Sequence, residues 1–195
     1  MCTSFVIFIY EFIGTFCLVG VINATKGNAS AIGLTLFFLL LLAGPISGAH
    51  FNPSVTLGVF INRLRTTENF NSHVVQAVIM IGAQIAGAMA GMYLFLQILD
   101  YANGDEVLNK NDFPMLKQKT QNWGQAEFIE MFSTFIFVSG VLLVKDPRAK
   151  IFSVSVGSDG VGFFGCAIIA LTLTAMVLFA GEHTGASINP AVSIS

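Results

Sequence analysis

The chain contains Ser47-Gly-Ala-His-Phe-Asn-Pro-Ser-Val-Thr56 and repeats it as Thr184-Gly-Ala-Ser-Ile-Asn-Pro-Ala-Val-Ser193, 137 residues further along. In both copies an asparagine, a good helix N-cap, stands before a proline, which suits the first turn of a helix. Each copy therefore predicts a loop followed by the start of a helix. A match of this length is not expected by chance, and we interpret the two copies as an internal repeat.

The repeat lies in a strongly apolar chain. Hydrophobic residues make up 54% of the 195 residues and charged residues 10%, and the mean hydropathy is +0.76. These values are typical of an integral membrane protein in contact with membrane lipid. The 11 acidic and 9 basic residues nearly cancel, so the charge does not favour nucleic acid as a partner.

Five apolar runs are long enough to cross a bilayer, which takes roughly 20 residues of helix. They cover about 5–24, 31–49, 74–99, 124–144 and 161–180. Because each segment must satisfy its own backbone hydrogen bonds in lipid, we expect helices. The apolar stretch of about a dozen residues after Asn52-Pro53 is too short to cross, so it predicts a half-helix that re-enters the membrane.

Basic residues indicate the orientation. Arg63, Arg65, Lys145, Arg148 and Lys150 follow the second and fourth runs, so these connectors and the N-terminus are predicted to be cytoplasmic. The mixed-charge connector 100–123 is predicted to lie outside. In the third run, the small residues Ala83, Gly87 and Gly91 recur every four positions and predict a tight helix–helix contact.

A second pair of segments supports the repeat. Glu11-Phe-Ile-Gly-Thr-Phe16 resembles Glu130-Met-Phe-Ser-Thr-Phe135, so each half begins with a helix that carries a membrane-embedded glutamate. We interpret 1–195 as a single channel domain with a first repeat at 5–99 and a second at 124–195. Three spans separate the Asn-Pro loops, so the second enters from the opposite face. Inverted repeats place a pathway at their interface, where Asn52 and Asn189 would meet.

The boxes Asn52-Pro53-Ser54 and Asn189-Pro190-Ala191, with the two glutamate-led helices, resemble those of the aquaporin and glycerol-facilitator family over essentially the whole chain. The resemblance implies an all-α membrane protein: an inverted-repeat, aquaporin-like helical bundle with two re-entrant half-helices and five of six spanning helices present. It also implies a homotetramer with a pore in each subunit. A sixth spanning helix does not follow Pro190, so we expect a fragment or a truncated gene product.

The resemblance also implies roles for individual residues. Asn52 and Asn189 would donate hydrogen bonds to a passing neutral solute, while the positive ends of the half-helices disfavour cations. Glu11 and Glu130 would hold backbone groups of the loops, and a proton relay is the alternative interpretation. His50 would fix its loop or sense pH. Gln84 is interpreted as a polar packing residue.

Four positions that narrow the outer mouth in water-selective relatives are apolar here. Counted without gaps from the boxes, they are Ile32, Val177, Ala186 and Val192. Val192 stands where the resemblance implies an arginine, which would supply hydrogen-bond donors and a positive charge. An apolar constriction argues against strict water selectivity. Ser193 stands where glycerol facilitators tend to carry an aspartate, so the sequence does not identify the class of solute.

The sequence therefore predicts a passive channel for water and/or small neutral solutes, with glycerol, ammonia and urea as candidates. An ion- or proton-coupled carrier is one alternative, since inverted repeats also build carriers and Glu11 and Glu130 could bind the coupling ion. A non-conducting membrane subunit is another. Enzyme motifs such as His-Glu-x-x-His and Gly-x-Ser-x-Gly are absent from the sequence, and we expect no catalytic residues, cofactor or metal.

Overall fold

The computed structural model describes residues 2–64, 69–103, 122–146 and 162–195, and the regular structure of these ranges is entirely α-helical. The helices are α1 (Cys2–Ala24), α2 (Ala29–Ser47), α3 (Pro53–Arg63), α4 (Phe70–Asn103), α5 (Trp123–Lys145), α6 (Phe163–Thr184) and α7 (Pro190–Ile194). Within the described ranges α1, α2, α4, α5 and α6 are long and apolar enough to cross a membrane. The short helices α3 and α7 begin at the two box prolines, as predicted.

The ends of the spanning helices differ from the predicted runs by a few residues. Helix α2 stops at Ser47, before the predicted end at 49, because Gly48 takes a left-handed φ of 90° that terminates the helix. Helix α6 continues to Thr184, past the predicted end at 180, because its left-handed glycine is Gly185. Residue 161, Arg65, Arg148, Lys150 and most of the connector 100–123 lie outside the described residues.

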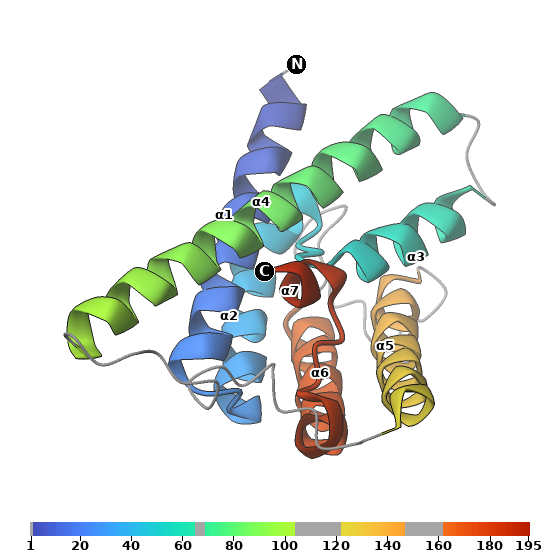
Figure 1. Cartoon of the computed structure of the whole chain (residues 1–195). Coiled ribbons are helices and arrows are strands. Elements are labelled where there is room, and N and C mark those ends of the chain that lie inside the picture. Colours follow the sequence, from blue (N-terminus) through green and yellow to red (C-terminus); the bar gives the residue numbers. More distant parts are fainter. Residues whose placement is uncertain (1, 65–68, 104–121, 147–161) are drawn as a thin grey trace.

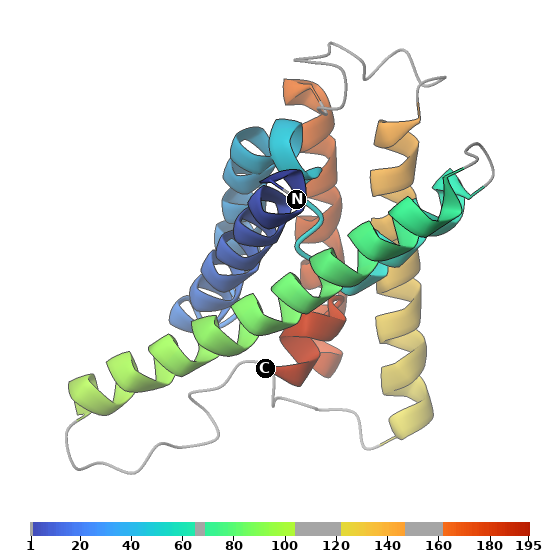
Figure 2. The same cartoon turned by 90° about the horizontal axis from the view of Figure 1, so that it is seen from above.

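The helices form one bundle around the two half-helices. Helix α1 packs against α2 and α4, α2 packs against α6, and α6 packs against α5. Figure 1 shows α7 near the centre of the bundle, and α7 contacts both α3 and α4. The view from above shows α4 crossing in front of the other helices (Figure 2). Because α3 and α7 meet inside the bundle, both Asn-Pro loops lie at its centre.

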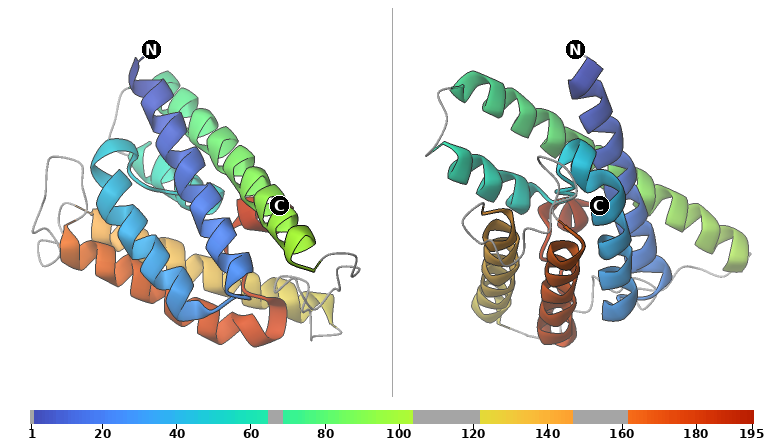
Figure 3. Two further views of the ribbon diagram at one scale, coloured as in Figure 1. Left: turned by 90° about the vertical axis from the view of Figure 1, so that its left-hand side faces the viewer. Right: turned by 180° about the vertical axis from the view of Figure 1, so that it is seen from behind.

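Glycines bring the backbones of α4 and α1 into direct contact. A Cβ atom at Gly87 would lie 2.3 Å from the carbonyl oxygen of Phe12, and one at Gly91 would lie 2.6 Å from that of Phe16. No side chain fits at these distances, so the predicted tight packing face is confirmed. The right-hand view of Figure 3 shows α1 and α4 crossing each other.

The outer surface of the bundle carries large apolar side chains. Exposed examples from the spanning helices are Phe5, Leu34, Phe38, Val78, Tyr93, Phe128, Phe135, Leu171 and Leu178. A soluble monomer rarely exposes so many large apolar groups over its helices. This surface fits a hydrocarbon environment.

Candidate functional site

The two Asn-Pro loops repeat each other in backbone conformation. Each loop places a glycine and two non-glycine residues at positive φ, in the same order. The φ values are 90°, 49° and 50° at Gly48, Ala49 and Phe51, and 91°, 53° and 51° at Gly185, Ala186 and Ile188. Non-glycine residues adopt this region only where the surrounding contacts hold them, and such residues cluster at functional sites. The sequence repeat is therefore also a repeat of strained structure.

The box asparagines start the half-helices. The side-chain Oδ1 of Asn52 accepts a hydrogen bond from the backbone N–H of Ser54 at 2.8 Å, and that of Asn189 accepts from Ala191 at 3.0 Å. Both asparagines have extended backbones, and a proline follows each as the first helical residue. The predicted N-caps are confirmed in both copies.

The same asparagines join the two loops to each other. Asn52 Nδ2 donates to the carbonyl oxygen of Ile188 at 2.9 Å, and Asn189 Nδ2 donates to that of Phe51 at 2.8 Å. An amide nitrogen carries two N–H donors, so each of these bonds leaves one donor for another acceptor. The structure therefore brings Asn52 and Asn189 together, each held in place by the opposite loop.

Glu11 of α1 is completely buried against the first loop. Its Oε1 accepts from the Ser47 hydroxyl at 2.7 Å and the His50 N–H at 3.0 Å. Its Oε2 accepts from the Phe51 N–H at 2.8 Å and Gln84 Nε2 at 2.7 Å. Four donors around one carboxylate compensate for its burial and fix the loop on the helix.

Glu130 of α5 holds the second loop in the same way. Its Oε2 accepts from the Ile188 N–H at 2.9 Å, and its Oε1 accepts from the Ser187 N–H at 3.1 Å. The hydroxyl of Thr184 is a further donor to Oε1. Glu130 is only partly buried, so the two glutamates share a geometry but not an environment.

His50 and Gln84 both contact Thr56 on α3. His50 Nδ1 lies 3.1 Å from the Thr56 hydroxyl oxygen, and Gln84 Nε2 donates to that oxygen at 2.9 Å. Gln84 therefore links α4 to both Glu11 and α3. In the second copy, serines take the corresponding positions, and the Ser187 and Ser193 hydroxyls are in contact.

A partly open pocket begins at the paired loops, with about 480 Å³ of empty space that includes open solvent. The four apolar positions singled out in the sequence, Ile32, Val177, Ala186 and Val192, all line it, together with Asn52, Asn189 and His50. Its walls also include Leu18, Ile22, Leu36, Phe137 and Leu173, from four spanning helices. None of the described residues that line it is Asp, Glu, Lys or Arg. The cavity suits an uncharged molecule with one or two polar groups.

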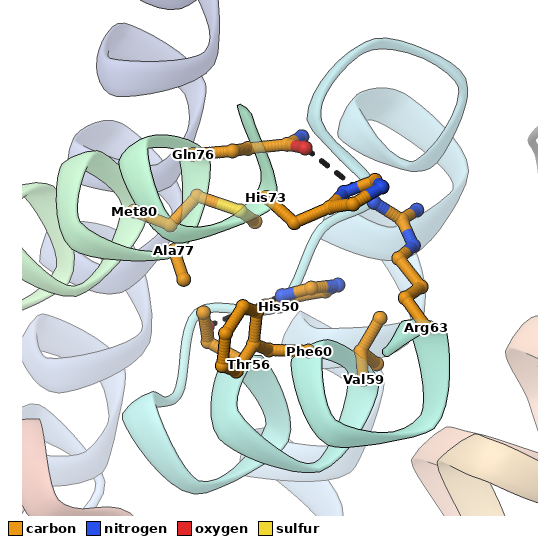
Figure 4. Close-up of a pocket in the computed structure, with 9 residues that line it drawn as sticks. All are labelled: His50, Thr56, Val59, Phe60, Arg63, His73, Gln76, Ala77 and Met80. Carbon is orange, nitrogen blue, oxygen red and sulfur yellow. Dashed lines mark hydrogen bonds between the residues drawn. The ribbon is translucent and has the colours of Figure 1, made fainter. Parts of the chain in front are cut away.

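A smaller, more open pocket lies between α3 and α4 and is also lined by His50, with about 220 Å³ of empty space that includes open solvent. Arg63, His73 and Gln76 gather at its rim, where Arg63 Nη1 donates to Gln76 Oε1 at 3.4 Å (Figure 4). His50 lines both cavities and so stands between them. Among the side chains that the structure describes, no cluster of three or more His, Cys, Asp or Glu could hold a metal ion.

The sequence analysis missed three contacts that shape the site. Ser47 and Thr184 supply hydroxyl donors to the glutamates, and Lys145 Nζ donates to the Gly48 carbonyl at 2.9 Å. The two hydroxyl residues are the first positions of the repeated segments 47–56 and 184–193, so aligning the copies could have revealed them. Lys145 was considered only as an indicator of orientation.

Comparisons with known proteins agree with this architecture. The family model described as Major intrinsic protein matches residues 1–195. Glycerol uptake facilitator protein-like 6 of Lactiplantibacillus plantarum is 31% identical over 96% of this chain and 81% of its own length. Lens fiber major intrinsic protein of Lithobates pipiens is 31% identical over 95% of this chain and 66% of its own length. Aquaporin-1 of Canis lupus familiaris is 31% identical over 88% of this chain and 58% of its own length.

Solved structures show the same fold. The X-ray structure of the aquaglyceroporin from Plasmodium falciparum matches with a TM-score of 0.73 at 20% sequence identity, covering 98% of this chain and 78% of that chain. The chain thus spans about two thirds of the frog lens protein, less of the canine aquaporin, and more of the bacterial protein. With the family match over residues 1–195 and five membrane-spanning helices, the chain is an integral, multi-pass membrane protein that belongs to the major intrinsic protein family.

Proposed function

We propose that the chain is a passive channel for small neutral solutes, water and glycerol among them. The observation that carries this proposal is the shared cavity, which both box asparagines and all four apolar constriction positions line. The solute path would run through it past Asn52 and Asn189. Relatives named for glycerol uptake and the aquaglyceroporin fold support a solute of glycerol size.

The paired loops supply the selectivity for neutral molecules. The N-termini of α3 and α7 carry partial positive charge and meet at the asparagines, so a cation there is disfavoured. Each asparagine keeps one N–H donor after its cross-loop bond, and a hydroxyl or water oxygen can accept it. The apolar walls give an ion no compensation for lost hydration.

We interpret Glu11 and Glu130 as supports of the loops rather than ion sites. The donors that surround Glu11 come from the loop backbone, the Ser47 hydroxyl and Gln84. A carboxylate that already accepts four bonds has little capacity for a coupling ion. This arrangement favours a channel over an ion-coupled carrier.

Orientation and assembly are part of the proposal. Arg63 and Lys145 lie at the ends of α3 and α5, and Lys145 contacts the end of α2, so these ends share one face. The excess of basic residues there supports a cytoplasmic assignment for that face and for the N-terminus. Family membership supports a homotetramer surrounded by lipid, with a pore in each subunit.

Val192→Arg tests the proposed constriction. Val192 is buried at the wall of the cavity, so an arginine there would narrow it and add a positive charge. We expect glycerol permeability to fall about tenfold while water permeability falls less, because the larger solute needs the space that the side chain takes. Stopped-flow light scattering of proteoliposomes measures both rates. Val192→Leu adds bulk without charge and is the matched control; equal inhibition of water and glycerol by Val192→Arg would contradict the assignment.

The channel itself is tested by the dependence of flux on gradients. Proteoliposomes would be challenged with glycerol, urea and an impermeant osmolyte, with and without an imposed proton or sodium gradient. We expect flux above that of empty vesicles that follows the solute gradient alone. Flux that requires the ion gradient would indicate a carrier, and flux equal to that of empty vesicles would indicate a non-conducting subunit.

A further inference from the structure

Lys145 connects the two repeats at one end of the solute path. It is the last residue of α5, and its Nζ donates to the carbonyl oxygen of Gly48, the residue that terminates α2. A Cβ built on Gly48 would lie 3.4 Å from His50 Nε2 and 3.7 Å from Lys145 Nζ. The ammonium group and the imidazole therefore flank the same loop residue.

The charged groups around His50 include two cations. Both Lys145 and Arg63 act electrostatically on His50, and Arg63 shares the smaller cavity with it. The acidic group that acts on Lys145 is Glu11, whose carboxylate already accepts four hydrogen bonds. Among the described charged groups that act on His50 or on Lys145, Lys145 and Arg63 are cations and Glu11 is the anion.

The charged groups lie at the His50 end of the cavity and not along its wall. The cavity reaches from His50 to Gly27, in the turn between α1 and α2, so its two ends correspond to the two ends of α2. Val192 and the other described wall residues carry no formal charge. The positive charge stands instead beside His50, where Lys145 is held by a backbone carbonyl.

We propose that Lys145, with Arg63, forms a second charge barrier beside His50, in addition to the half-helix ends, that helps to exclude protons and cations from this pore. The inference rests on the proposed channel function. A fixed ammonium beside the loop of His50, which lines the cavity, raises the energy of a passing cation but barely affects a neutral solute. Lys145 is thus a specificity-determining residue for the same path, at the opposite end from Val192.

The test separates charge from hydrogen bonding at position 145. Lys145→Arg keeps the charge and a donor, Lys145→Gln keeps a donor without charge, and Lys145→Met removes both. Proton entry would be followed with trapped pyranine in proteoliposomes under a potassium diffusion potential set by valinomycin. Glycerol flux would be measured on the same vesicles and normalised to inserted protein.

We expect Lys145→Gln and Lys145→Met to raise the proton leak about tenfold at low ionic strength, with Lys145→Arg equal to wild type and glycerol flux kept within about twofold. Arg63→Gln should raise the leak less, because Arg63 is exposed. If Lys145→Gln leaves the proton leak unchanged and glycerol flux is intact, the proposed charge barrier is overturned while the proposed channel function stands. A leak in Lys145→Arg as large as in Lys145→Met would also overturn it. Wild-type vesicles without solute flux would overturn the proposed channel, and this inference with it.

Discussion

Replacing Glu11 by leucine is expected to prevent accumulation of folded protein. The substitution leaves the donors of Ser47, His50, Phe51 and Gln84 buried without their acceptor. The Ser47 hydroxyl can still turn to the Ala43 carbonyl oxygen at 3.5 Å. Each of the other three buried donors costs roughly 1–3 kcal/mol when it is left unsatisfied, so the total is at least about 3 kcal/mol. Domains are stable by only about 5–15 kcal/mol, so little stability would remain. Size-exclusion chromatography in detergent and apparent melting temperature measure the loss.

Glu130→Leu is the matched comparison for this prediction. Glu130 holds three donors rather than four and is only partly buried, so water or lipid headgroups can replace part of the interaction. We therefore expect a smaller decrease in melting temperature than for Glu11→Leu. Equal stability of Glu11→Leu and wild type would contradict the interpretation of Glu11 as a loop support. In that case, lost proton flux in Glu11→Gln would favour the relay.

Gly87→Leu is expected to separate α4 from α1. The new Cβ would stand 2.3 Å from the Phe12 carbonyl oxygen, and this obstacle is backbone, which cannot rotate away. Overpacking of a tight interface typically costs 1–3 kcal/mol, and here we expect about 3 kcal/mol or more. Because α4 also carries Gln84, the contacts to Glu11 and Thr56 would weaken with it. The apparent melting temperature in detergent should fall clearly.

Gly82→Leu provides the control on the same helix. Gly82 is exposed, and nothing lies within 4 Å of a Cβ built there. A leucine at an exposed position of a spanning helix would face lipid, so we expect little change in melting temperature. Similar destabilisation by both substitutions would show that α4 tolerates no leucine for reasons unrelated to the α1 contact.

The features that could be predicted from the sequence depend on local chemistry and on the repeat. The Asn52 and Asn189 N-caps follow from the preference of asparagine for that position, and the structure forms both. The recurrence of Ala83, Gly87 and Gly91 on one helix face predicted a tight contact, and Gly87 and Gly91 form it with α1. Counting without gaps from the boxes identified four residues that line one cavity.

The features that were missed depend on contacts between distant segments. Lys145 and Gly48 are 97 residues apart, and no pattern in either segment indicates that a side chain would reach the other. The reciprocal bonds from Asn52 to Ile188 and from Asn189 to Phe51 likewise require both loops to be placed first. The end of α2 was placed late because the apolar run continues past the left-handed Gly48.

The paired asparagines test the central claim most directly. Asn52→Asp with Asn189→Asp replaces two amide donors by carboxylates, which cannot donate to the carbonyls of Ile188 and Phe51. The measurement is glycerol and water flux in proteoliposomes by stopped-flow light scattering, for wild type and the double variant at equal protein density. We predict fast wild-type flux that falls at least about tenfold in the variant, because the donors to the solute and the cross-loop bonds are lost together. Fast flux that is unchanged in the double variant would show that the solute path does not pass between the two loops.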